Sequence, residues 1–378
     1  MISSGIIYLL TIAAIAGVFG IAERYERTSR YFIYLPAIVL VYLFAMVAAQ
    51  GGVWQKSEEI ENVYTTARNN ILPAMLFLML LQLDLSRFVR LGRSMLIAYV
   101  AATLSIAVAF AAVFAIFGFG ETEAGLFGAL CGSWMGGTAN MLAVGGALGV
   151  DEVQMGYALV VDAVCYTFWV VFLLSIVRFA PRFSSWSGAA VSSSEVAGEI
   201  GCSCTIGPKR YWLLLGSAFF VALLSQTIAN HLGGLGTTAW TVLIATVLGI
   251  VGSFMPLSRI NGSAELASTM LLLLVALIGS RADFSDFGSV PLYVAAGFSI
   301  LSIHALLLVA AAKLFRLDLF SIAVASLANI GGVASAPVLA AAYDRALVGI
   351  AVLMAVVGYL VGTFGGLGVG YLLRWLCE

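Results

Sequence analysis

Two polar, glycine-rich stretches interrupt apolar runs of the chain: Ser133-Trp-Met-Gly136-Gly137-Thr138-Ala139-Asn140 and Asn329-Ile-Gly331-Gly332-Val-Ala-Ser335-Ala-Pro337. A glycine inside a helix costs about 1 kcal/mol relative to alanine and a proline about 3 kcal/mol, so each stretch predicts a break between two shorter helices. Backbone groups that a break frees inside lipid must be satisfied by protein, water or ligand. We therefore expect both breaks to line a cavity or a packed interface.

Composition places these runs in a membrane. Of the 378 residues, 62% are hydrophobic and 10% are charged, and the mean hydropathy is +1.06. Soluble domains carry about 25% charged residues, and about 20 apolar residues suffice for a helix to cross a bilayer. The apolar runs lie at 2–22, 31–49, 71–83, 94–119, 124–148, 153–178, 211–229, 237–256, 264–280, 290–312, 318–342 and 346–373. The sequence predicts an integral, multi-pass membrane protein.

Two features of the chain set its predicted boundaries. The first run has no Lys or Arg before it and no small-residue cleavage site, so we expect a retained helix rather than a removed signal peptide. A polar, Ser-rich segment separates the first six runs from the last six, and its charges exclude it from lipid. We therefore predict a first membrane repeat over residues 1–180, a solvated linker over 181–210 and a second membrane repeat over 211–378.

The two halves share two patterns in the same order. A leucine-rich run that ends at Asp84 resembles a run that ends at Asp283, 199 residues later. The stretch Gly136-Gly-Thr-Ala-Asn140 resembles Gly331-Gly-Val-Ala-Ser335, 195 residues later. Because two independent matches share nearly one offset, the sequence indicates duplicated halves, which are typical of secondary transporters.

Lys and Arg are enriched in cytoplasmic loops, so their distribution predicts how the two halves are oriented. If all twelve runs cross the bilayer, the halves are parallel and 8 Lys/Arg face the cytoplasm against 10 outside. If each Gly-broken segment enters and leaves on one side, the second half is inverted and the numbers become 14 and 4. We favour an all-α fold of two inverted repeats, each with about five crossings and one Gly-broken segment, re-entrant or discontinuous. The alternative is that both broken segments cross and the number of helices differs elsewhere.

Ionisable residues inside the apolar runs are further candidates for the site. Asp162 lies about nine residues into its run, where a carboxylate costs about 2.5–3.5 kcal/mol and needs a cation, a proton or a polar partner. We interpret it as a coupling-ion or proton site, the alternative being a hydrogen-bonded carboxyl that braces the break. His304 lies near the centre of another run, where a lone histidine is more often a packing residue than a transport residue.

Half-helix N-termini bind anionic groups and half-helix C-termini bind cations, so the breaks themselves are candidate binding sites. The candidate substrate- and ion-binding residues are Ser133, Gly136, Gly137, Thr138, Asn140, Asp162, Asn329, Gly331, Gly332, Ser335 and His304. The alternative for both breaks is helix packing through small residues.

The chain offers no enzyme motif. H-E-x-x-H, the P-loop and G-x-S-x-G are all absent, and two histidines do not support a multi-His metal site. The net charge of −1 does not suggest nucleic acid as a partner. We therefore expect a non-enzyme without a cofactor, whose partners are the lipid bilayer, a small solute and a coupling ion, Na⁺ or H⁺.

With its Gly136-Gly-Thr-Ala-Asn-Met141 and Ala328-Asn-Ile-Gly-Gly332 motifs, the chain resembles the YjcL-like family of polytopic membrane proteins over nearly its whole length. That family, long described as a domain of unknown function, is grouped with cation/proton antiporters, bile-acid symporters and related anion transporters. The resemblance implies discontinuous helices in a core domain that moves against a scaffold or dimerisation domain, hence a homodimer. It also implies a Na⁺ site, to which Asn140 and Asp162 match by position. The second half differs, because Val357 stands where an acid would mirror Asp162.

The leading prediction is a secondary active transporter in the plasma (inner) membrane. It moves a small organic solute, with anions among the candidates, coupled to Na⁺ or H⁺ by alternating access. One alternative is a cation/proton antiporter in which Asp162 exchanges a proton for Na⁺. An alternative of another class is a membrane scaffold or sensor whose breaks serve only packing.

Overall fold

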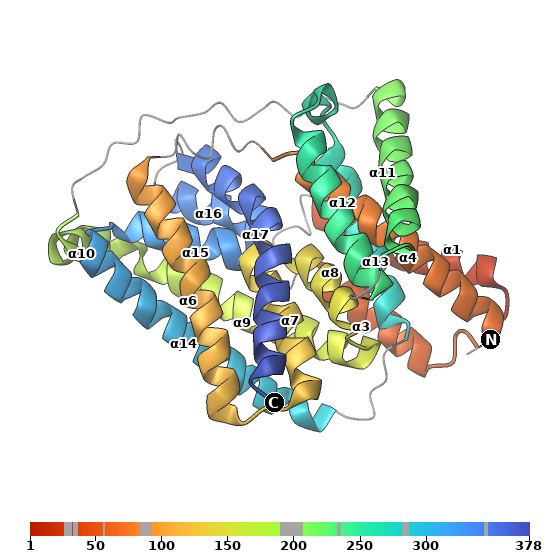
Figure 1. Ribbon diagram of the computed structural model, residues 1–378, viewed down its shortest axis with the longest axis horizontal. Coiled ribbons are helices and arrows are strands. Elements are labelled where there is room, and N and C mark those ends of the chain that lie inside the picture. The colour runs from red at the N-terminus through yellow and green to blue at the C-terminus, as the bar shows by residue number, and fades with distance from the viewer. Residues whose placement is uncertain are drawn as a thin grey trace. The chain divides into compact units, whose positions relative to one another are not determined.

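The computed structural model describes residues 1–25, 32, 37–55, 57–83, 92–189, 207–232, 236–281, 287–343 and 347–378. These residues form an all-helical protein, as predicted (Figure 1). The first part contains α1 (Gly5–Arg24), α3 (Ala37–Gln50), α4 (Glu58–Leu80), α6 (Arg93–Phe117), α7 (Glu121–Gly136), α8 (Thr138–Leu148), α9 (Glu152–Ile176) and α10 (Ala180–Ser187). The second part contains α11 (Pro208–Ala229), α12 (Thr237–Ser253), α13 (Ser263–Gly279), α14 (Val290–Phe315), α15 (Leu319–Ile330), α16 (Gly332–Tyr343) and α17 (Val348–Trp375). The 3-10 turns are η1 (Val177–Phe179), η2 (Pro256–Arg259) and η3 (Phe287–Ser289).

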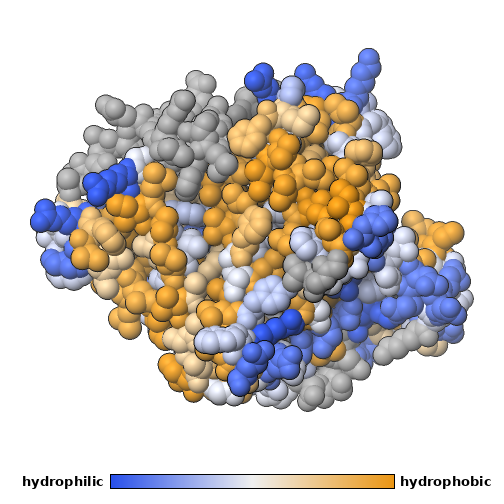
Figure 2. Space-filling view, viewed as in Figure 1, coloured by the Kyte–Doolittle hydropathy of each residue, from blue (hydrophilic) through white to orange (hydrophobic). Residues whose placement is uncertain are grey.

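The helices and their surface fit a bilayer. Among the described residues, six helical stretches are long and apolar enough to cross a membrane: Gly5–Arg24, Arg93–Phe117, Glu152–Ser187, Pro208–Ala229, Val290–Phe315 and Val348–Trp375. Hydrophobic residues cover much of the face seen in Figure 2. Large apolar side chains at least 60% exposed include Ile6, Leu10, Leu104, Ile116, Phe220 and Leu306. An apolar surface this extensive is unfavourable in water and favourable against lipid.

Each predicted apolar run overlaps a helix, but the third helix begins earlier than its run. Helix α4 starts at Glu58, not near residue 71, because its first half is polar yet stabilised. The Ser57 side chain caps it by accepting from the Ile60 amide, and acidic side chains in the first turn favour the positive end of the helix dipole. Further along, Tyr64 donates a 2.8 Å hydrogen bond to Glu152. Hydropathy alone does not register such stabilisation.

The beginning of the predicted linker is also helical. Residues Ala180–Ser187 form α10, with Pro181 in its first turn and Gly188 as a left-handed C-cap at φ 75°. The part of the linker from residue 190 to residue 206 lies outside the described residues. Asp84 and Asp283, which end the first repeated pattern, also lie outside them.

The chain forms two compact units, and each unit draws on both halves of the sequence. The first unit contains residues 1–82, 145–163 and 205–291, and the second contains residues 83–144, 164–204 and 292–378. The two predicted repeats follow one another in the sequence, whereas each compact unit combines segments from both repeats. In the first unit, α4 packs against α1, α11, α12 and α13.

The second unit is built around a close pair of helices, α7 and α17, which lie side by side (Figure 1). Glycines four residues apart line both helices at the contact. A Cβ added to Gly366 of α17 would lie 2.6 Å from the Cα of Gly132 of α7, so the two backbones are nearly in contact. Small residues at this spacing allow such an approach in membrane helices. Helix α15 packs against α6, α7, α16 and α17.

Candidate functional site

Both Gly-Gly pairs separate two helices, and both lie in the second unit. The first separates α7 from α8 and the second separates α15 from α16. In each pair the second glycine has a positive φ, which is 89° at Gly137 and 60° at Gly332. Residues with a Cβ rarely adopt such a φ, so each break requires glycine at its second position.

The first glycine of each pair has a different role, which is close contact. A Cβ on Gly136 would overlap the Asn140 side chain and the Gly358 carbonyl oxygen. A Cβ on Gly331 would overlap the Ser335 hydroxyl and lie 2.8 Å from the Tyr166 ring. In both breaks, therefore, the polar side chain four residues later folds back over the first glycine.

At the first break, Asn140 is buried, and both ends of its side-chain amide have hydrogen-bond partners. Its Nδ2 donates to the Gly136 carbonyl at 2.9 Å and lies 3.5 Å from the Gly358 carbonyl. Its Oδ1 accepts a 2.7 Å hydrogen bond from Thr363 Oγ1. The side chain thus ties the end of α7 to α17.

At the second break, Ser335 is buried but unsatisfied. It is 5% exposed, and among the described residues its Oγ has no hydrogen-bond partner. A buried hydroxyl without a partner costs about 1–3 kcal/mol. Such groups are few in native proteins, and some of them hold a ligand or take part in catalysis. Ser335 is therefore a candidate for contact with a bound solute.

Helix α17 brings the two breaks together at Gly358. A Cβ on this residue would lie 3.1 Å from the Met135 carbonyl oxygen and 3.4 Å from the Gly136 Cα, both at the end of α7. It would also lie 3.5 Å from the Ala328 carbonyl oxygen, near the end of α15. The C-terminal ends of α7 and α15 therefore meet the same point of α17.

Asn329 has both ends of its amide within hydrogen-bond distance of a partner. Its Nδ2 donates to the Ala325 carbonyl at 2.9 Å, and its Oδ1 lies 3.2 Å from Thr103 Oγ1. The residue is fully buried. Asn329 thus braces the last turn of α15 against α6.

His304 lies in a buried chain of hydrogen bonds. Trp169 Nε1 donates to Ser326 Oγ at 2.9 Å, and Ser326 Oγ lies 2.8 Å from His304 Nε2. His304 Nδ1 lies 2.7 Å from Ser105 Oγ, which also lies 2.8 Å from the Ala102 carbonyl. A neutral His304 protonated at Nδ1 gives every donor in this chain an acceptor. The arrangement matches the packing role that is the more common one for a lone histidine.

The other predicted residues lie in more varied surroundings. Ser133 is buried, and its carbonyl accepts from the Gly137 amide at 2.5 Å. Thr138 begins α8 and is partly exposed. Asp162 is partly exposed within α9 and belongs to the first unit, whereas Asn140 belongs to the second. A shared Na⁺ site for these two residues remains a prediction.

Sequence reasoning missed the α17 partners of the first break. Thr363, Gly358 and Gly362 contact it, and Gly366 continues the same face of α17. Gly358, Gly362 and Gly366 are spaced four residues apart, as are Gly132 and Gly136 on α7. This spacing was the sequence pattern that could have predicted the contact. Ser326 and Trp169 were also missed, because isolated Ser and Trp residues in apolar helices carry no pattern. Among the described residues, no group of three His, Cys, Asp or Glu side chains has the geometry of a metal site.

The sequence matches the family described as "Protein of unknown function (DUF819)" over residues 10–376. The chain belongs to this family. It is also similar to the uncharacterized membrane protein YjcL of Bacillus subtilis (strain 168), with 25% identity over 373 residues that cover 93% of this chain and 92% of the relative. This relative and the six long apolar helices show an integral, multi-pass membrane protein. The resemblance to a YjcL-like membrane family is confirmed.

Proposed function

We propose that this protein is a secondary active transporter for a small organic solute with an anionic group, coupled to Na⁺ or H⁺ by alternating access. The buried Ser335 hydroxyl at the second helix break, which has no hydrogen-bond partner in the described part of the chain, carries this proposal. The two breaks share a positive φ at the second glycine, yet the first is closed by hydrogen bonds and the second retains a buried polar group that has none among the described residues. We assign the solute to the second break for this reason.

The helix end at this break favours an anionic group. Helix α16 begins at Gly332, and the first amides of a helix have no partner within the helix. The helix dipole places partial positive charge at the same end. Ser335 lies in the first turn, and we assign its hydroxyl and these amides as the donors for a carboxylate or a similar group.

We assign the coupling ion to Asp162. A carboxylate in the apolar α9 favours binding of a cation or a proton. The close packing of α7 on α17 favours movement of the second unit as one body. The plasma (inner) membrane and the homodimer, both expected from the sequence, belong to the same proposal.

Ligand-induced thermal stabilisation tests the proposal first. Purified protein is screened against organic anions with and without Na⁺, because a ligand that binds only the folded state raises its stability. We expect one class of anion to stabilise the protein and Ser335→Ala to abolish that shift. Ser302→Ala is the matched control, since Ser302 is exposed on α14 and donates within its own helix.

Flux in proteoliposomes tests the coupling. Solute uptake is expected to require a Na⁺ or H⁺ gradient and to fall strongly in Asp162→Asn. Na⁺ flux that depends on pH but on no solute would support the cation/proton antiporter instead. If Ser335→Ala and Asp162→Asn both retained wild-type flux and ion binding, transport through these residues would be contradicted and a scaffold or sensor favoured.

A further inference from the structure

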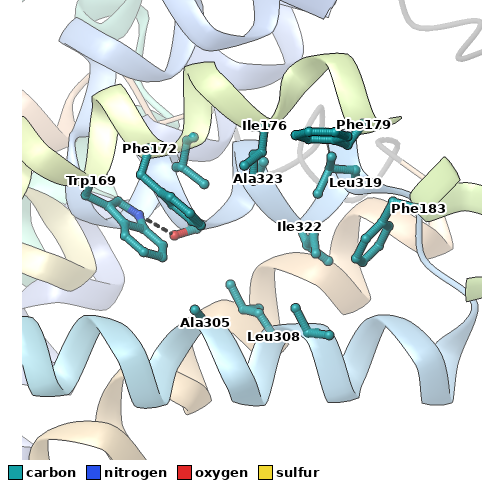
Figure 3. A pocket seen from close by; sticks show the side chains of 13 residues that line it. Trp169, Phe172, Ile176, Phe179, Phe183, Ala305, Leu308, Leu319, Ile322 and Ala323 are labelled. Atoms are coloured by element: carbon teal, nitrogen blue, oxygen red, sulfur yellow. Dashed lines mark hydrogen bonds between the residues drawn. The ribbon is translucent and has the colours of Figure 1, made fainter. Parts of the chain in front are cut away.

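A cavity of about 250 Å³ lies in the second unit between the end of α9, α14 and α15 (Figure 3). Apolar and aromatic side chains form its wall, among them Trp169, Phe172, Phe179, Phe183, Leu308 and Ile322. The lining includes one serine, Ser326, whose buried Oγ already accepts from Trp169 and contacts His304. The wall therefore offers a ligand apolar contact and little hydrogen bonding.

Basic residues flank, in the sequence, the segments that form the Phe179 and Phe183 end of the cavity. Arg178 and Arg182 each neighbour one of these phenylalanines in sequence, and Lys313 and Arg316 lie at the end of α14. All four are exposed. The described acid beside them is Asp318, whose carboxylate caps α15 by accepting from the Ser321 amide at 2.6 Å. Two of these cations thus stand next in sequence to residues that line the cavity, and two lie at the end of α14, whose Leu308 lines its wall.

Contacts hold α10 against the end of α14. Lys313 Nζ donates to the Trp186 carbonyl at 2.5 Å and lies 5.0 Å from the centre of the Trp186 ring. Trp186 is itself 47% exposed. A short helix with exposed aromatic and basic side chains is typical of the membrane–water interface. This composition favours a position of α10, and of the cavity end beside it, at the depth of lipid headgroups.

We infer that the cavity binds one acyl chain of an anionic phospholipid, with the phosphate group held by Arg182, Lys313 and Arg316. The volume lies just below the roughly 300–1,000 Å³ of small-molecule sites, which suits a narrow chain. An acyl chain in the cavity gains little apolar contact over one in the bilayer, so selectivity comes from the basic residues. In the predicted inverted arrangement of the two repeats these residues lie on the cytoplasmic side, where anionic lipids are enriched.

Native mass spectrometry of protein titrated with phosphatidylglycerol or phosphatidylcholine of identical chains tests this inference. The wild type is expected to bind one molecule of phosphatidylglycerol more tightly than any further molecules of it. It is also expected to bind phosphatidylglycerol more tightly than phosphatidylcholine. In R182Q/K313Q/R316Q we expect affinity for phosphatidylglycerol to fall about five-fold for each lost cation, with little change for phosphatidylcholine. K209Q/R210Q is the matched control, because these cations are exposed at the start of α11.

A second variant tests the acyl chain itself. Ala305→Phe places a ring in the cavity wall and is expected to remove the tight lipid, whereas Ala295→Phe, on an exposed position of the same helix, is expected to leave it bound. Equal affinity for the two lipids in the wild type would overturn the inference. So would retention of the tight lipid in Ala305→Phe that elutes as folded protein, or its displacement by a soluble organic anion.

Discussion

Thr363 donates a 2.7 Å hydrogen bond to the side-chain oxygen of Asn140, 223 residues earlier in the chain. Both side chains are buried, and Asn140 also donates to the carbonyl of Gly136 beside the first helix break. The contact therefore fixes the end of α7 to the middle of α17. The stability of the first break should depend on this one hydroxyl of a distant helix.

Replacing Thr363 by Val should destabilise the protein by about 1–3 kcal/mol, because the Asn140 oxygen loses its buried donor while the shape of the side chain is kept. Thr363→Ser retains the hydroxyl and should be closer to the wild type. Thermal unfolding in detergent micelles measures both variants. Wild-type stability in Thr363→Val, with a loss of stability only in Thr363→Ser, would indicate that the methyl group, and not the hydrogen bond, matters.

Two glycines of α17 should respond oppositely to alanine. In Gly366→Ala the new Cβ meets the Gly132 backbone at 2.6 Å, so α7 and α17 must separate and stability should fall by about 1–3 kcal/mol. In Gly368→Ala the Cβ meets no atom within 4 Å among the described residues, and better helix propensity should raise stability by up to about 1 kcal/mol. The unfolding midpoints of the two variants, measured in the same detergent, test this prediction. Similar midpoints would contradict the close glycine contact.

Gly137→Ala should be destabilising although nothing crowds the site closely. Gly137 has φ 89° and ψ 169°, a region that residues with a Cβ avoid at a cost of about 1–3 kcal/mol. The new Cβ would lie 3.9 Å from the Tyr359 ring, an ordinary contact distance, so a loss of stability would report backbone strain. The unfolding midpoint is compared with that of Gly368→Ala. No difference between the two variants would show that the break relaxes without cost.

Ser326→Ala should destabilise the buried chain by about 1–3 kcal/mol, because Trp169 Nε1 and His304 Nε2 lose a partner together. Ser302→Ala, an exposed serine on α14, should have almost no effect. Unfolding followed by tryptophan fluorescence measures stability in both variants. Wild-type stability in Ser326→Ala would show that water replaces the hydroxyl.

Replacing Ser335 should have the opposite effect on stability. Because its hydroxyl has no partner among the described residues, Ser335→Ala should keep or raise the unfolding temperature without ligand, unlike Ser326→Ala. The same variant should lose the stabilisation that an organic anion gives to the wild type. A clear loss of stability without ligand would instead show that Ser335 has a structural hydrogen bond.

The helices were largely predictable, since a run of apolar residues must form a helix to satisfy its backbone in lipid. The start of α4 was not, because its polar first half is stabilised by a cap and by contacts with Glu152, which is distant in sequence. The difference in hydrogen bonding between the two breaks could not be predicted from the sequence either. Asn140 and Ser335 occupy equivalent positions, and only their neighbours distinguish them.

The sequence by itself determined the membrane class, the approximate positions of the apolar helices and the location of both Gly-Gly breaks, because apolar length and glycine content act locally. Only the tertiary structure decided that the two breaks meet at Gly358, that Asn140 is satisfied by Thr363 and that Ser335 has no partner among the described residues. It also decided that the compact units mix both halves. These features depend on which helices pack together, and apolar side chains that face lipid and apolar side chains that face another helix look alike in a sequence.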